Sequence, residues 1–128
     1  MSSKYEITFK DNILFIKLNE KLDLEGVQRL IQQLADNYDY RYRLWDLSTF
    51  NADFTLSELR HYACVGEEIL TKPSAIALYS PSDRLFGEMR QYAAVRDTTN
   101  NTVLNTFRDY DQAVDWLVSQ QNSPMFVD

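Results

Sequence analysis

The segments RLWDL at residues 43–47, TLSE at 55–58 and SAIALY at 74–79 decide the fold of this chain. The first and the last are short apolar runs, which are typical of strands buried in a sheet. TLSE is a capping box, in which the Thr55 hydroxyl accepts a hydrogen bond from a free backbone N–H group and Glu58 reaches back to the helix start. Together the three segments predict a strand, a helix and a strand.

The sequence before this unit predicts a hairpin and a first helix. Residues 5–10 alternate between apolar and polar side chains, residues 13–18 are more apolar, and Asp11 and Asn12 between them favour a turn. Asp23 is suited to cap a helix, and apolar residues then recur at helical spacing as far as Leu34.

The sequence after the unit repeats the alternation of helix and strand. Residues 80–83 favour a turn into a third helix, which carries packing residues from 85 to 93, and the polar residues 97–101 end it. Residues 102–107 predict a last strand, and Asp109 is placed to cap a last helix.

The predicted order is therefore ββαβαβαβα, which belongs to the α/β class. Strands that alternate with helices imply right-handed crossovers and a mostly parallel mixed sheet covered by helices, with the first strand antiparallel. The chain of 128 residues has the length of one domain, which we place at residues 1–120 with a C-terminal tail at 121–128.

Composition excludes several functional classes. The net charge of −6 argues against nucleic acid as a partner, because phosphate binding requires clustered Lys and Arg. The sequence predicts no membrane span, since no apolar run approaches the roughly 20 residues that a membrane helix needs. It shows no signal peptide and a single cysteine, Cys64, which suits a reducing compartment, so we expect a cytoplasmic protein.

Four segments give the chain a resemblance to a known family: WDL at 45–47, SDRLFGEMRQY at 82–92, FRD at 107–109 and AVDWL at 113–117. They resemble the SpoIIAA-like or STAS-like domains, bacterial relatives of the anti-sigma-factor antagonists, over nearly the whole chain. The resemblance implies a single STAS-like domain that acts as a non-enzymatic regulatory or protein-interaction module. Its partner would be another protein or a second copy in a homodimer.

Two further properties of the family bear on the function expected of this chain. Antagonist domains are switched by phosphorylation of a serine in a segment resembling Asp-Ser-Ser-Gly before the second helix, and residues 51–57 lack that segment. Relatives on this branch are similar in topology to lipid-carrying CRAL-TRIO domains. This implies an alternative function, the carriage or sensing of a small apolar or anionic ligand.

The loop from Ser48 to Thr55 is the first candidate site, together with Trp45 and Asp46 before it. Hydroxyl groups at Ser48, Thr55 and Ser57 lie near a helix start, where N–H groups and the helix dipole stabilise a phosphate. The alternative is that Thr55 is simply an N-cap and that the serines are solvated.

The helix start from Phe86 to Arg90 is the second candidate site. Ligands of open α/β sheets bind outside the carboxyl ends of the strands, where helices begin. Gly87 costs a helix about 1 kcal/mol relative to alanine, which predicts a close approach at this position, and Arg90 could meet an anion. The alternative is that Gly87 serves helix packing and that Arg90 forms an ion pair.

A surface for a protein partner is predicted at Tyr38, Tyr40 and Tyr42, because tyrosine combines apolar area with a polar tip. The alternative is that alternate rings pack beneath the helices. No metal site is predicted, because His61 and Cys64 are the only residues of their kinds. The sequence contains no catalytic motif, so we assign no catalytic residue and expect no cofactor.

Overall fold

The computed structural model describes residues 4–96 and 102–122. It confirms the predicted order of nine elements and the α/β class. The elements are β1 (Tyr5–Lys10), β2 (Ile13–Leu18), α1 (Leu24–Asn37), β3 (Tyr42–Asp46), α2 (Leu56–Ile69), β4 (Ser74–Tyr79), α3 (Asp83–Arg96), β5 (Thr102–Phe107) and α4 (Tyr110–Gln121).

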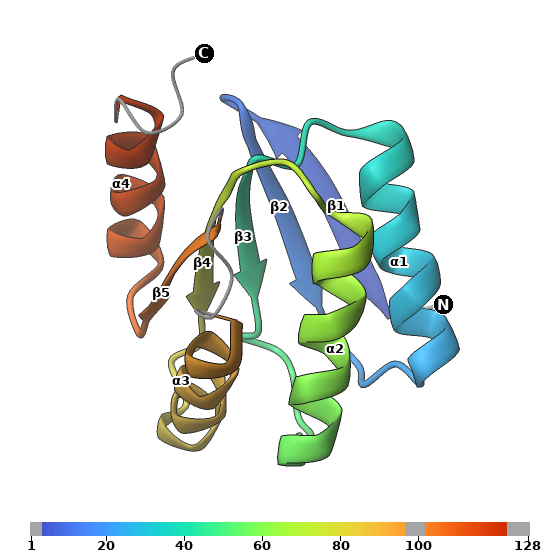
Figure 1. Ribbon diagram of the computed structural model, residues 1–128. Coiled ribbons are helices and arrows are strands. Elements are labelled where there is room, and N and C mark those ends of the chain that lie inside the picture. Colours follow the sequence, from blue (N-terminus) through green and yellow to red (C-terminus); the bar gives the residue numbers. More distant parts are fainter. Residues whose placement is uncertain (1–3, 97–101, 123–128) are drawn as a thin grey trace.

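The five strands form one mixed sheet in the order β1-β2-β3-β4-β5. β1 runs antiparallel to β2, and the remaining pairs are parallel, as the sequence predicts. Helices α1, α2 and α3 cover one face of the sheet, and α4 lies against the other (Figure 1). The carboxyl ends of four parallel strands therefore meet at one edge, beside the starts of the helices.

Alternating side chains divide the core into two layers. On β4, Ile76 and Leu78 face the three helices, whereas Ala75 and Ala77 face α4. The small alanines let α4 approach the sheet closely, and Ala113 of α4 is fully buried there. The deeper core lies on the side of the three helices, because that face receives most of the large aliphatic side chains.

Local chemistry sets the boundaries of these elements. Asp11 and Asn12 have positive φ angles of 54° and 65°, the conformation that a two-residue turn between twisted strands requires. The Asp23 carboxylate accepts a hydrogen bond from the Gly26 N–H at 2.7 Å, and Thr55 forms the predicted capping box with Glu58. These caps satisfy N–H groups that have no partner within the helix.

Two elements have bounds that differ from the sequence predictions. The third strand begins and ends one residue earlier than expected, at Tyr42–Asp46. α4 continues to Gln121, so the first residue of the expected tail is helical. The rest of that tail from 123 and the polar segment 97–101 lie outside the described residues. Within the described ranges, every helix is too short or too polar to cross a bilayer.

Two arginines are buried on the side of the three helices. Arg43 and Arg96 are each 1% exposed. Arg43 Nη1 donates to the Tyr40 carbonyl at 2.6 Å and to Ser74 Oγ at 3.1 Å, while Arg96 Nη1 donates to the Ala63 carbonyl at 3.0 Å. Burial and the neighbouring Arg96 lower the pKa of Arg43 to about 10. Arg43 therefore ties the segment before β3 to the start of β4, and Arg96 ties α3 to α2.

Candidate ligand-binding site

An apolar cavity of about 110 Å³ lies between α1, α2, α3 and the carboxyl ends of β2, β3 and β4. This is the edge at which open α/β sheets bind ligands. The lining residues are Leu18, Leu22, Val27, Leu30, Ile31, Trp45, Leu47, Phe54, Leu59, Tyr62, Leu78, Glu88, Met89 and Tyr92.

Hydrocarbon dominates the lining. Glu88 is the one acidic residue among the lining residues, and Tyr62, Tyr92 and Trp45 are the others whose side chains carry a polar N or O atom. A concave, largely apolar space with a few polar groups is the usual form of a small-molecule site. The arrangement therefore suits an apolar ligand with one polar substituent.

Aromatic rings from the 48–55 loop close one side of the cavity. Phe54 lies in its lining and stacks on Phe50, with 4.8 Å between ring centroids. The Tyr62 ring of α2 meets Phe54 edge-on at 5.6 Å. This wall therefore combines a ring from the 48–55 loop with a ring from α2.

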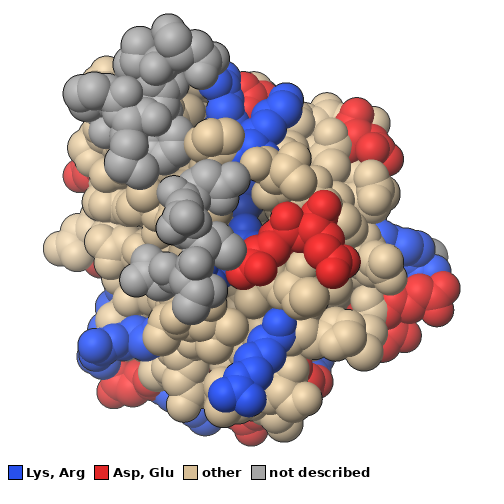
Figure 2. Space-filling view, viewed as in Figure 1, with Lys and Arg blue, Asp and Glu red and all other residues tan. Residues whose placement is uncertain are grey.

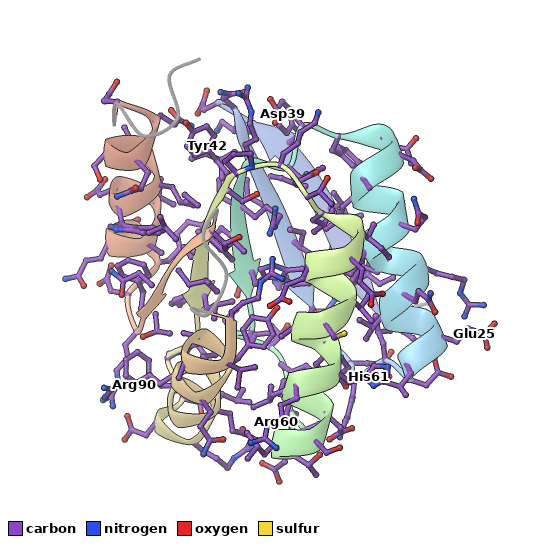
Figure 3. The ribbon with its side chains drawn as sticks, viewed as in Figure 1. Glu25, Asp39, Tyr42, Arg60, His61 and Arg90 are labelled. Carbon is purple, nitrogen blue, oxygen red and sulfur yellow. The ribbon has the colours of Figure 1, made fainter. Side chains whose placement is uncertain are left out.

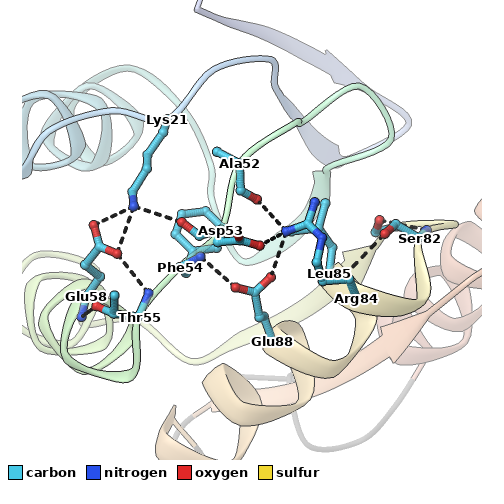
Figure 4. A network of polar contacts seen from close by, with 11 residues as sticks. Lys21, Ala52, Asp53, Phe54, Thr55, Glu58, Ser82, Arg84, Leu85 and Glu88 are labelled. Carbon is cyan, nitrogen blue, oxygen red and sulfur yellow. Dashed lines mark hydrogen bonds and ion pairs between the residues drawn. The ribbon is translucent and has the colours of Figure 1, made fainter.

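A polar network fastens the same loop to the helices (Figure 4). The Phe54 N–H donates to Glu88 Oε1 at 2.6 Å. Arg84 Nη1 donates to the Ala52 carbonyl at 3.1 Å and pairs with Asp53. Lys21 Nζ donates to the Asp53 carbonyl at 2.8 Å. Three side chains thus hold the Ala52–Phe54 backbone against the cavity.

The two carboxylate oxygens of Glu88 have different partners. Its side chain is 15% exposed, and Oε1 is engaged by the Phe54 N–H group. Oε2 is buried and has no hydrogen-bond partner among the described residues, although Arg84 Nη1 forms an ion pair with it at 3.7 Å. One oxygen therefore holds the loop, and the other has the ion pair with Arg84 but no hydrogen bond.

Of the residues in the first predicted site, Trp45 lines the cavity. Asp46 accepts a hydrogen bond from the Ser48 N–H at 2.9 Å and lies outside the cavity. Ser48 and Ser57 are exposed, and Thr55 is the N-cap of α2. The loop reaches the cavity through Phe54 and not through its hydroxyl groups.

None of the residues of the second predicted site, Phe86, Gly87 and Arg90, lines the cavity. The close approach expected at Gly87 is wrong, because a Cβ there would have no atom within 4 Å. Phe86 lies under the Arg108 guanidinium, whose carbon is 4.5 Å from the ring centroid. Arg90 is exposed and points away from the molecule (Figure 3). α3 reaches the cavity through Glu88, one residue beyond Gly87, and through two residues further along.

The tyrosine surface expected for a partner is not formed. Tyr40 and Tyr42 are each 5% exposed and pack on opposite faces of the sheet, and Tyr38 is half-buried against the same core as Tyr40. The Tyr40 hydroxyl accepts a hydrogen bond from the Lys72 N–H at 3.1 Å. Residues two apart in a regular strand share one face, but Tyr40 precedes β3, and the rings are divided between the two core layers. Little ring area is therefore left for a contact surface.

No group of three His, Cys, Asp or Glu side chains in the described ranges is placed to hold a metal ion. Cys64 Sγ lies 3.7 Å from Glu68 Oε1, and that carboxylate raises the pKa of the Cys64 thiol. A raised pKa lowers the thiolate fraction, so this cysteine is a poor nucleophile.

The face shown in Figure 2 intersperses Lys and Arg with Asp and Glu over α2 and α3.

Because buried tyrosines resist ionisation, the stability of the fold decreases as the pH rises through the alkaline range. Burial raises the pKa of Tyr92 and of Tyr62, both in the cavity lining. A raised folded-state pKa means that the stabilising contribution is complete below about pH 10 and is lost as the pH rises through the folded-state value. Arg43 acts in the opposite sense, since its pKa is lowered.

We therefore expect the Tyr92→Phe variant to lose less stability than the native chain between about pH 9 and about pH 11. Urea unfolding at the two pH values measures the difference. Equal losses in both proteins would show that Tyr92 does not resist ionisation in the folded state.

A second, polar hollow lies on the opposite face, between β1, β2 and α4. Its lining residues are Glu6, Thr8, Lys10, Asp11, Phe15, Lys17, Asp46, Tyr110, Asp111, Val114 and Asp115. Charged side chains of both signs make it unsuited to an apolar ligand.

Comparison of the chain with protein-family models, with characterised proteins and with solved structures found no match. The assignment of a function therefore rests on the geometry of the cavity.

Proposed function

We propose that this chain is a non-enzymatic, STAS-like binding domain that carries or senses a small apolar molecule. The observation that supports the proposal is the apolar cavity at the carboxyl ends of β2, β3 and β4, closed on one side by Phe54. Buried apolar surface supplies the binding energy at about 25 cal/mol per Å².

The size of the cavity limits the ligand. An engineered protein cavity of about 150 Å³ lined by Leu, Ile and Phe stays dry and binds benzene or xenon. At about 110 Å³ the present cavity is slightly smaller. It therefore matches one aromatic ring or a short branched alkyl group, and a modest shift of the Phe54 loop would admit a larger molecule.

A cavity-filling variant tests this proposal with benzene as the probe. Val27 of α1 is half-buried in the lining, so a phenylalanine at this position occupies the space that the ligand needs. We expect Val27→Phe to weaken benzene binding at least about tenfold, a free-energy change of about 1.4 kcal/mol. Isothermal titration calorimetry on the folded proteins measures the affinity.

The same substitution at Val118 is the matched control, because that side chain is 43% exposed on α4, on the opposite face of the sheet. Val118→Phe should bind benzene like the native chain. Benzene binding that survives unchanged in Val27→Phe would place the probe elsewhere and defeat the proposal.

Regulation through a protein partner or a second copy is a second candidate. It is favoured by the uncovered face of β1 and β2, where Glu6, Thr8 and Lys10 are exposed beside α4. Light scattering over a range of protein concentrations distinguishes a homodimer, whose mass doubles, from a domain that stays monomeric.

A further inference from the structure

We propose that the ligand carries one hydrogen-bond donor, a hydroxyl or an N–H group, and that Glu88 Oε2 accepts it. This inference rests on the proposed function and names the chemical class of the ligand. It also identifies Glu88 as the residue that determines specificity.

The position of Oε2 is fixed by the contacts of the other oxygen. The Phe54 N–H donates to Oε1 at 2.6 Å, so the carboxylate is oriented by the loop and by its own helix. Glu88 is one of the residues that line the cavity, and its buried Oε2 has no hydrogen-bond donor among the described residues. Arg84 Nη1 is 3.7 Å away, which is beyond hydrogen-bond distance.

An unused buried acceptor is costly, because it has lost its bonds to water without replacement. A water molecule in the cavity could serve it, but an ordered water needs two to four polar partners and most of this lining is hydrocarbon. A ligand with an apolar body and one donor satisfies the acceptor and fills the apolar space at the same time.

The charge of Glu88 selects between polar groups. A carboxylate accepts hydrogen bonds and cannot donate them. Small alcohols, phenols and neutral amines are therefore favoured, and ethers, ketones and carboxylates are disfavoured. The proposal favours a neutral ligand over an anionic one, because an anion beside Glu88 would repel its carboxylate.

The test uses the Glu88→Gln variant with two pairs of probes of equal size. Glutamine keeps a carbonyl oxygen for the Phe54 N–H and places an NH₂ donor where Oε2 was. Phenol and toluene differ in a donor, whereas pyridine and benzene differ in an acceptor. Glu25→Gln on α1 is the control, because the Glu25 side chain is 77% exposed and the charge change is the same.

We expect the preference for phenol over toluene, measured as the ratio of their Kd values, to fall about tenfold in Glu88→Gln. The preference for pyridine over benzene should rise in the same variant, and Glu25→Gln should change neither ratio. Titration calorimetry at about pH 8 gives all four affinities for uncharged probes. A purely structural role of Glu88 would move both ratios in the same direction or leave both alone.

Two failures are distinguishable. If benzene and toluene bind but both ratios stay within about twofold of the native values, the acceptor role of Glu88 is wrong and the proposed function stands. If neither benzene nor toluene binds the native chain, the proposed function fails, and the inference fails with it.

Discussion

Leu30→Ala is expected to lower the free energy of unfolding by about 3 kcal/mol, within the range of about 2 to 5 kcal/mol for such truncations in a packed core. Leu30 lies on α1, is 2% exposed and lines the cavity. Its truncation removes buried methyl groups and enlarges a space that is already present. Urea unfolding of the two proteins measures the loss.

An apolar ligand should reverse part of this loss. Anything that binds only the folded state stabilises it in proportion to the logarithm of ligand concentration over Kd. We therefore expect toluene to raise the stability of Leu30→Ala more than that of the native chain, since the larger cavity leaves more room for the probe.

Leu44→Ala is the matched control for this experiment. Leu44 is fully buried in the layer beneath α4, on the other face of the sheet. Its truncation should cost a similar free energy without rescue by toluene. Rescue of both variants to the same extent would mean that toluene binds any enlarged core and that the native cavity is not special.

Gly66→Val is expected to lower the free energy of unfolding by about 2 kcal/mol, as overpacking of a core typically does. A Cβ at Gly66 would lie 3.1 Å from Nη1 and 3.4 Å from Cζ of Arg96. Arg96 is 1% exposed and donates to the Ala63 carbonyl, so its guanidinium has little freedom to move. The branched valine would force that buried group out of place.

Gly87→Val supplies the control for this second prediction. Both glycines are inside helices, but a Cβ at Gly87 meets open space. Valine has a slightly higher helix propensity than glycine, so we expect a change within about 0.5 kcal/mol. Thermal unfolding of the two variants compares them directly, and an equal loss at both sites would mean that Arg96 accommodates the side chain.

The fold could be predicted from the sequence because its signals are local. Caps at Asp23 and Thr55, the turn at Asp11 and Asn12, and apolar periodicity each act within a few residues. The alternation of strands and helices then leaves few topologies.

The site could be predicted only in part. The hydroxyl groups near the start of α2 direct attention to the 48–55 loop, and Trp45 before it lines the cavity. The hydroxyl groups of that loop give a signal because a phosphate site has a recognisable chemistry. An apolar wall has no such motif, since its residues resemble any other part of a core.

The position of Glu88 on the buried face of α3 can be predicted from the sequence. It stands three residues after Leu85 and four before Tyr92, so helical spacing puts it on the buried face of α3. A carboxylate on such a face requires a partner, which makes it a candidate for function. The sequence does not predict that Gly66 is crowded and Gly87 is not. That difference depends on a contact between Gly66 and Arg96 from another helix.

A crystal pressurised with xenon tests the central claim most directly. Xenon enters dry apolar cavities of this size and is located by its electron density. We predict one xenon atom between Leu30, Leu59 and Met89, bounded by Phe54. Continuous side-chain packing at that place, with no xenon bound there, would contradict the account.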